Sequence, residues 1–142
     1  MLTITKEFAF EAAHLLENHP SKCKNLHGHS YRLLVTVTKK ELDNNMIIDF
    51  ADLKKVVNEE LIDKIDHSFI YNTNTDKEYV KEIATVLAKY GLKMFAFNTR
   101  STCEEMSKVF FEMLQEKLKE INIELVSIEL YEGPGSYATY SR

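Results

Sequence analysis

Two kinds of apolar periodicity divide this chain of 142 residues and limit the folds that it can adopt. Apolar and polar residues nearly alternate in Leu2–Phe10 and in Val126–Leu130, close to the two ends of the chain. A period of two is typical of a strand with one buried face. Between Phe50 and Leu118, apolar residues recur at helical spacing instead. The chain therefore begins and ends with strands and places its helices between them.

The predicted elements follow in the order strand, strand, helix, helix, helix, strand, strand. The strands are Leu2–Phe10, Ser30–Lys40, Val126–Leu130 and Tyr137–Tyr140, and Met94–Phe97 is a candidate for a further short strand. The helices are Phe50–Ile65 with Asp49 as N-cap, Val80–Ala88 ending at Gly91, and a third that begins at Ser101 or Thr102 and contains Leu118. This order predicts an α+β fold, in which an antiparallel four-stranded sheet has the helices packed on one face. Such a sheet has two open edges, so we expect oligomerisation through them.

Composition excludes several classes of function. The formal net charge is −4, so the chain offers no basic field for nucleic acid. No apolar run approaches the roughly 20 residues of a membrane span. Met1–Lys6 lacks the charged head and apolar core of a signal peptide, and Cys23 and Cys103 lie in different contexts. We therefore expect a single cytoplasmic domain, residues 1–142, with free thiols and a small-molecule substrate.

The sequence His27-Gly28-His29 lies where a loop gives way to the second strand. Residues two apart in a strand project from the same face, so the two imidazoles lie side by side, and Gly28 leaves room between them. The alternation of the first strand, continued to its end, brings His14 to the same end of the sheet. Catalytic zinc is commonly bound by three protein ligands of this kind. The three histidines therefore form a candidate zinc site.

Cys23 lies four residues before His27 and between Lys22 and Lys24, in a polar loop. Neighbouring cations lower the pKa of a thiol, so Cys23 is a candidate base. The same short spacing also allows Cys23 to be a fourth zinc ligand, which would close a structural site. Spacing alone leaves both alternatives open.

Acidic residues complete the set of candidates. Asp66 precedes His67 at the end of the first predicted helix, and a carboxylate beside an imidazole favours proton transfer. Glu132 continues the apolar row of Val126–Leu130 and needs a partner, such as the paired N–H donors of a planar heterocycle. Glu104 and Glu105 lie in the first turn of the third helix, where carboxylates also have a structural role.

Several motifs, in this order, resemble the family of 6-pyruvoyltetrahydropterin and 6-carboxytetrahydropterin synthases, which have the tunnelling fold. The motifs are Phe8–His14, Cys23–Tyr31, Ile47–Phe50, Ile65–His67, Ser101–Glu104 and Leu130–Glu132. The resemblance implies 7,8-dihydroneopterin triphosphate as substrate. It also implies that the sheets of neighbouring subunits join into a barrel, in a trimer or a homohexamer of two stacked trimers, with active sites between subunits.

The resemblance assigns a role to each candidate residue. It implies that Zn²⁺ is bound by His14, His27 and His29, that Cys23 is the general base, and that Asp66 and His67 are a proton-transfer pair. It also implies Glu132 as the anchor of the pterin ring, with Thr102 and Cys103 lending backbone groups and Glu104 lying nearby. The reaction that it implies is a lyase reaction that releases triphosphate. Because no net redox change occurs, no organic cofactor is expected.

The short spacing between Cys23 and His27 resembles the spacing in the carboxy-forming branch of the family. Members of that branch also release acetaldehyde and serve queuosine synthesis. The alternatives are a 6-pyruvoyltetrahydropterin synthase and a non-enzymatic binding module with a structural zinc. Ser101, Glu105 and Gly133 depart from the family pattern, which usually has Pro, Asn and Thr there. Residues 71–98 are longer than is usual in the family. We expect an inserted helical segment there, which either covers the site entrance or extends the oligomer surface.

Overall fold

The computed structural model describes residues 1–142, and its strands form one six-stranded sheet in the order β4-β3-β1-β2-β5-β6. The strands are β1 (Ile4–His14), β2 (His27–Thr38), β3 (Ser68–Asn72), β4 (Met94–Phe97), β5 (Glu124–Gly133) and β6 (Ser136–Ser141). β1, β2, β5 and β6 pair antiparallel, whereas β3 pairs parallel with both β1 and β4. The α+β class is confirmed. The prediction of an antiparallel four-stranded sheet is wrong, because the sheet is mixed and has six strands.

β4 matches the candidate short strand Met94–Phe97, whereas β3 has a physical origin that periodicity does not reveal. Ser68, Phe69 and Ile70 are consecutive buried residues, so β3 shows no alternation between a buried and an exposed face. Parallel strands cannot be joined by a tight turn and need a crossover connection. The helix α3 (Glu78–Lys89) is that connection, because it joins β3 to β4.

The predicted helix after Asp49 is a helical run of three parts: α1 (Phe50–Val57), the π-type turn η2 (Asn58–Ile62) and α2 (Asp63–Ile65). The Asp49 carboxylate accepts a hydrogen bond from the Ala51 N–H at 2.7 Å, which confirms the predicted N-cap. α4 (Cys103–Glu120) begins after Thr102, whose hydroxyl accepts from the Glu105 N–H at 3.2 Å. None of these helices has both the length and the hydropathy needed to cross a membrane.

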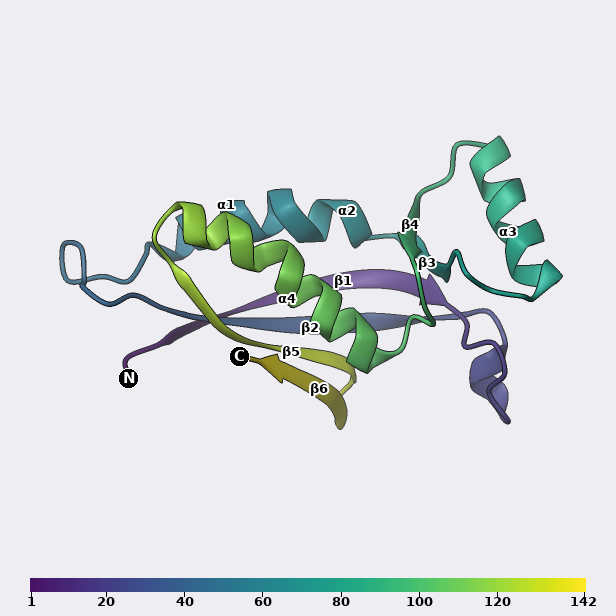
Figure 1. Cartoon of the computed structure of the whole chain (residues 1–142), viewed down its shortest axis with the longest axis horizontal. Helices are drawn as coiled ribbons and strands as arrows, with labels where there is room; N and C mark the ends of the chain where they lie inside the picture. The colour runs from purple at the N-terminus through teal and green to yellow at the C-terminus, as the bar shows by residue number, and fades with distance from the viewer.

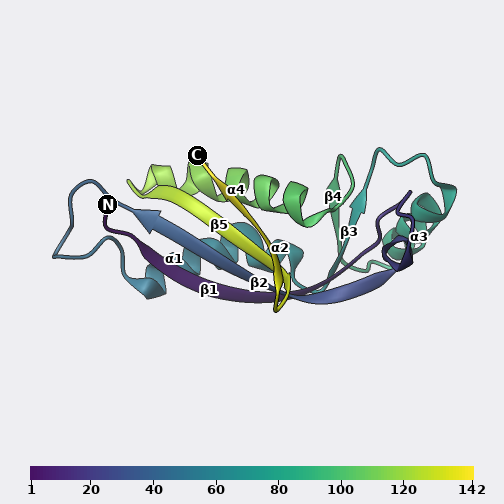
Figure 2. The same cartoon turned by 90° about the horizontal axis from the view of Figure 1, so that it is seen from below.

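The main core lies between the sheet and the helices that cover one of its faces. Figure 1 shows α1, α2 and α4 along the same side of the long strands, and Figure 2 shows these helices behind the sheet. A cluster of 24 buried residues fills this layer. α3 lies apart at one end of the molecule, where Val80 packs with Leu15 and Phe69 in a separate small cluster.

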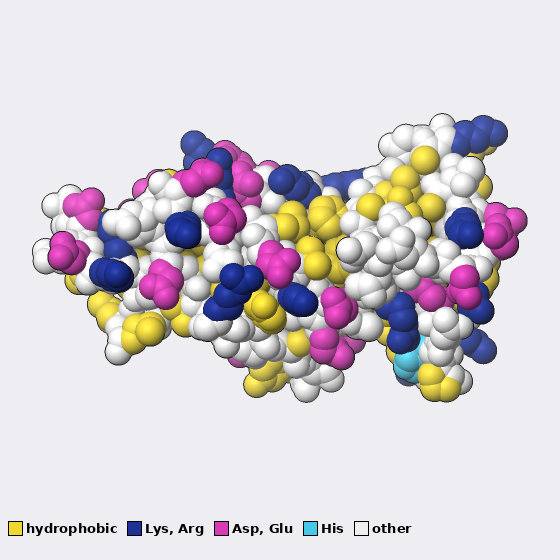
Figure 3. All heavy atoms as spheres, in the orientation of Figure 1, with side chains coloured by type: hydrophobic (Ala, Val, Ile, Leu, Met, Phe, Trp, Pro, Cys, Tyr) yellow, Lys and Arg dark blue, Asp and Glu magenta, His cyan; other side chains and the backbone are white.

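Apolar surface remains exposed near the segment that contains α3. Hydrophobic side chains gather between the helical layer and α3 in Figure 3, whereas charged side chains are spread over the helical layer. Val86, Tyr90 and Leu92, on and just after α3, are each more than half exposed. The segment thus presents apolar side chains that this chain alone does not cover.

The pairing of β1 with β2 positions the candidate site. The register runs without a bulge from Ile4 opposite Val37 to His14 opposite His27. The predicted antiparallel pairing, with His14 at the same end as the His27–His29 pair, is confirmed.

Candidate functional site

Three imidazoles converge at the end of the β1–β2 pair. One ring nitrogen from each of His14, His27 and His29 lies within 4.8 Å of the others. The ring centroid of His14 is 4.6 Å from that of His27 and 5.1 Å from that of His29. His14 is buried, and the other two are half-buried. This group, which we call the three-histidine group, can hold a metal ion.

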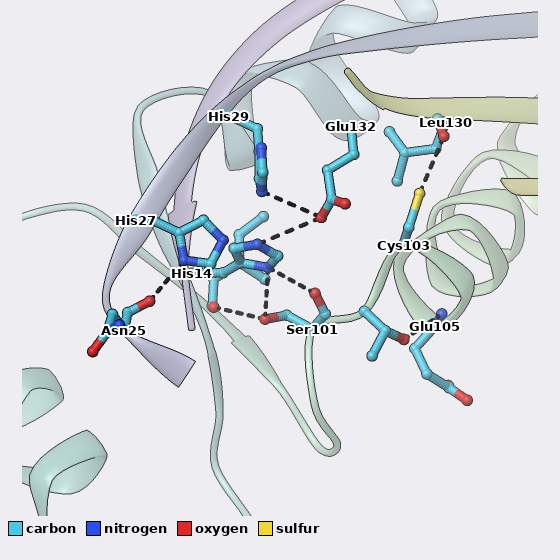
Figure 4. A network of polar contacts seen from close by, with 11 residues as sticks. His14, Asn25, His27, His29, Ser101, Cys103, Glu105, Leu130 and Glu132 are labelled. Carbon is cyan, nitrogen blue, oxygen red and sulfur yellow. Dashed lines mark hydrogen bonds and ion pairs between the residues drawn. The ribbon is translucent and has the colours of Figure 1, made fainter. Parts of the chain in front are cut away.

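Backbone carbonyls fix two of these imidazoles. Nδ1 of His14 lies 2.9 Å from the carbonyl oxygen of Ser101, and Nδ1 of His27 lies 2.6 Å from that of Asn25 (Figure 4). A carbonyl oxygen only accepts, so each ring donates from Nδ1, and in the neutral imidazole this leaves Nε2 unprotonated. Metal-binding histidines in proteins commonly show this arrangement. Burial lowers the pKa of His14 to about 4, so the ring is neutral at pH 7.

The free Nε2 atoms fit a cation. Nε2 of His14 is buried and has no hydrogen-bond partner. The nearest carboxylate oxygen, Oε1 of Glu132, lies 3.6 Å from it, and 3.3 Å from Nε2 of His29. An unprotonated ring nitrogen and a carboxylate oxygen both act as acceptors, so neither satisfies the other. A metal ion would supply the missing electrophile, which makes the donor set suitable for zinc.

Glu132 lies close to the start of α4. It follows Tyr131 on β5, which pairs with Arg32 on β2, so Glu132 is near the three-histidine group. The Cys103 thiol donates to the carbonyl oxygen of Leu130 at 3.1 Å (Figure 4). Burial raises the pKa of Cys103 to about 11, so this thiol stays protonated and is not a nucleophile at neutral pH.

The other two predicted ring-contact residues have different surroundings. The Thr102 hydroxyl is committed to the N-cap of α4. The Glu104 side chain is exposed and makes no hydrogen bond or ion pair. Of the predicted pterin-contact residues, Glu132 is therefore the one that combines an uncommitted carboxylate with a position beside the three-histidine group.

Asp66 and His67 contact each other but not the three-histidine group. His67 Nδ1 lies 3.0 Å from Asp66 Oδ1. Glu11 holds the pair, because its N–H donates to Asp66 Oδ1 at 2.9 Å and its carbonyl accepts from the His67 N–H at 2.6 Å. These bonds hold His67 in left-handed backbone, with φ of 59°. The hydrogen bond from the Glu11 N–H, more than the neighbouring His67, holds the pKa of Asp66 below its usual value.

His67 lines a cavity of about 600 Å³, together with Glu11, Gly28, Ser30 and one member of the three-histidine group, His29. Glu11, Gly28 and Ser30 alternate along β1 and β2 with the three histidines, so they belong to the other face of the sheet. Within one chain, the proton-transfer pair forms no hydrogen bond or ion pair with the three-histidine group.

Cys23 lies in the short turn η1 (Lys22–Lys24), between β1 and β2. The carbonyl oxygen of Cys23 accepts from the Leu16 N–H at 2.9 Å, which ties this turn to the end of β1. The thiol is free and half-buried, and it is not part of the three-histidine group.

Sequence reasoning did not identify three residues that hold the site. Asn25 and Ser101 act through carbonyl oxygens, and Glu11 acts through its backbone N–H and carbonyl. Every residue carries these groups, so no side-chain signal distinguishes them. Of the three residues, only Asn25 is indicated by its position in the sequence, because it lies two residues before His27.

The fold and the three-histidine group together define an α+β protein with a candidate metal centre in its sheet. The sequence profile described as 6-pyruvoyl tetrahydropterin synthase matches residues 3–142. The chain therefore belongs to the 6-pyruvoyl tetrahydropterin synthase family.

Individual relatives agree with this assignment. The chain is 40% identical to the 6-carboxy-5,6,7,8-tetrahydropterin synthase of Haemophilus influenzae, with 99% of each chain covered. It is 36% identical to the protein of the same name from Aquifex aeolicus, with 96% of each covered. The fold resembles that of the 6-pyruvoyl tetrahydropterin synthase of Plasmodium falciparum, with a TM-score of 0.73 at 21% identity over 99% of this chain and 97% of the other.

Proposed function

We propose that this chain is a zinc-dependent 6-carboxy-5,6,7,8-tetrahydropterin synthase. The proposed lyase converts 7,8-dihydroneopterin triphosphate and one water molecule to the 6-carboxy product, triphosphate and acetaldehyde, as a step of queuosine synthesis in the cytoplasm. The observation that carries the proposal is the three-histidine group, in which backbone carbonyls leave Nε2 of His14 and His27 free for a metal. The names of the relatives from Haemophilus influenzae and Aquifex aeolicus support the carboxy-forming reaction.

In this proposal the three histidines hold Zn²⁺, which when bound polarises the hydroxyl groups of the substrate side chain. Glu132 accepts the N–H donors of the pterin ring, and the start of α4, with Thr102, Cys103 and Glu104, borders the ring. Cys23 removes a proton from the substrate side chain. His67, supported by Asp66, returns a proton as triphosphate leaves.

The proposal includes an assembly of several copies. Residues 1–142 form one pterin-synthase-like domain in it, and residues 71–98 are an inserted segment. Within one chain His67 forms no hydrogen bond or ion pair with the three-histidine group, which supports a site completed by a neighbouring subunit. A trimer or a dimer of trimers provides such a site, as the family resemblance implies.

Product analysis tests the reaction. We expect the zinc-loaded protein to release both triphosphate and acetaldehyde from 7,8-dihydroneopterin triphosphate. Release of triphosphate with no acetaldehyde would overturn the carboxy-forming reaction and favour the 6-pyruvoyltetrahydropterin synthase.

A Cys23→Ala variant separates an enzyme from a binding module with a structural zinc. If Cys23 is the base, the variant keeps its zinc content and its melting temperature but loses turnover. Loss of zinc together with loss of folding would instead make Cys23 a fourth ligand and support the non-enzymatic alternative.

A further inference from the structure

Ser101 connects the candidate metal centre to strand β3. The residue is 1% exposed and lies in the segment between β4 and α4. Its carbonyl oxygen accepts from Nδ1 of His14 at 2.9 Å (Figure 4). Its hydroxyl donates to the carbonyl oxygen of Ile70 at 3.2 Å. One buried residue thus contacts both the most buried imidazole of the three-histidine group and the middle of β3.

The segment that precedes Ser101 is held in register with β3. Thr73 donates to the carbonyl oxygen of Phe97 from both its N–H and its hydroxyl, each at 2.8 Å. The Asn74 side chain donates to the carbonyl oxygen of Asn98 at 2.6 Å. The chain leaves the sheet after β3, forms α3 and returns in β4, and these bonds fix the point of return just before Ser101.

We propose that Ser101 is a positioning residue for His14, and that the paired strands β3 and β4 set its position. This inference rests on the proposed function, in which His14 is a zinc ligand. It gives the segment 71–98 a role at the metal centre through its two ends.

The contacts of Ser101 fix the orientation of the His14 ring. The bond from Nδ1 to the Ser101 carbonyl selects the tautomer of His14 and directs Nε2 toward the other imidazoles. The hydroxyl bond to Ile70 fixes that carbonyl in turn. Where the family usually has Pro, the ring of Pro restricts φ of the same residue. Here a buried hydrogen bond replaces that covalent restriction.

Zinc affinity tests the proposal, measured by competition with a chromophoric chelator. Ser101→Ala keeps the carbonyl but removes the hydroxyl, so we expect zinc affinity to fall by about threefold to tenfold, at or below the low end of losses at groups that orient metal ligands. Ser107→Ala is the matched control. Ser107 is 2% exposed and donates to the carbonyl oxygen of Glu104 at 2.7 Å, without contact to an imidazole. We expect this variant to bind zinc like the unmodified protein.

Two further measurements separate positioning from general destabilisation. In the metal-free protein, ¹⁵N chemical shifts should show a smaller share of the Nδ1–H tautomer of His14 in Ser101→Ala than in Ser107→Ala. Asn74→Ala alters an exposed residue outside the site, and should lower zinc affinity by less than Ser101→Ala does. Unchanged zinc affinity in Asn74→Ala would overturn the role proposed for the β3–β4 pair.

The outcomes distinguish this proposal from the proposed function. Unchanged zinc affinity and an unchanged tautomer in Ser101→Ala, while His14→Ala loses zinc binding, would overturn the role of Ser101 alone. Zinc affinity that survives His14→Ala would overturn the metal site itself.

Discussion

The carboxylate oxygen Oε1 of Glu132 lies 3.3 Å from Nε2 of His29. A pterin ring held by Glu132 would therefore have its side chain next to the three-histidine group. Under the proposed function, this distance would bring ring recognition by Glu132 next to the metal, as action on one substrate molecule requires.

Glu132→Gln should reduce kcat/KM by about 100-fold or more, because the amide places an N–H donor against the donors of the ring. Zinc content should stay the same. Steady-state kinetics and metal analysis measure both quantities. Glu129→Gln is the control, because Glu129 lies on the same strand and pairs with Leu34 and Thr139, away from the site. Loss of zinc in Glu132→Gln would make Glu132 a metal ligand.

Gly28→Ala should destabilise the protein by roughly 1–2 kcal/mol. An added Cβ at Gly28 would lie 3.1 Å from the carbonyl oxygen of Ala12, so β1 and β2 would have to separate between the two histidines. Gly135→Ala is the control, since nothing lies within 4 Å of its Cβ. For Gly135→Ala we expect no loss of stability, or a gain of a few tenths of a kcal/mol. Urea unfolding of the two metal-free variants measures these changes in stability. Equal changes in both variants would contradict the prediction.

Asp66→Asn should weaken the dependence of stability on pH. The pKa of Asp66 is lower in the folded protein than its unfolded value, chiefly because of the bond from the Glu11 N–H. The folded state therefore favours the carboxylate, and its contribution is present above pH ~4 and is lost as pH falls through the folded pKa. The difference in unfolding free energy between pH 7 and pH ~3 should be smaller in Asp66→Asn than in the unmodified protein. Asp63→Asn is the control, because the Asp63 carboxylate forms no hydrogen bond or ion pair. This variant should keep the full difference in unfolding free energy between the two pH values.

Tyr31→Phe should leave the unfolding free energy unchanged or raise it by up to about 1 kcal/mol. The Tyr31 hydroxyl is buried without a hydrogen-bond partner, and its ring stacks on Phe10 at 4.8 Å, a contact that Phe retains. Tyr140→Phe, at a ring that packs on Phe111, is the comparison. A fall of more than 1 kcal/mol in Tyr31→Phe would reveal a hydrogen bond through bound water.

The sequence was sufficient to locate His14, because β1 keeps its alternation through 11 residues and pairs with β2 without a bulge. The sequence was not sufficient to predict which groups surround the His14 side chain. Ser101 is separated from His14 by 87 positions in the chain and makes its contact through a carbonyl oxygen. That contact depends on β3 and β4, whose parallel pairing is a long-range property of the chain.

The relation of His67 to the metal centre was also beyond sequence reasoning. The adjacency of Asp66 and His67 is visible in the sequence, and the structure brings the two side chains into contact. The face of the sheet that the Asp66 and His67 side chains reach depends on which strand β3 pairs with. Because β3 lies beside β1, with Ala12 opposite Ser68, His67 lies next to Glu11.

Within one chain, His67 forms no hydrogen bond or ion pair with the three-histidine group. Under the proposed chemistry, an isolated chain would carry parts of two reaction centres and the whole of neither. Catalytic output would then depend on protein abundance more steeply than in direct proportion, with little activity at high dilution. Two inactive variants, one without His27 and one without His67, would complement each other when mixed.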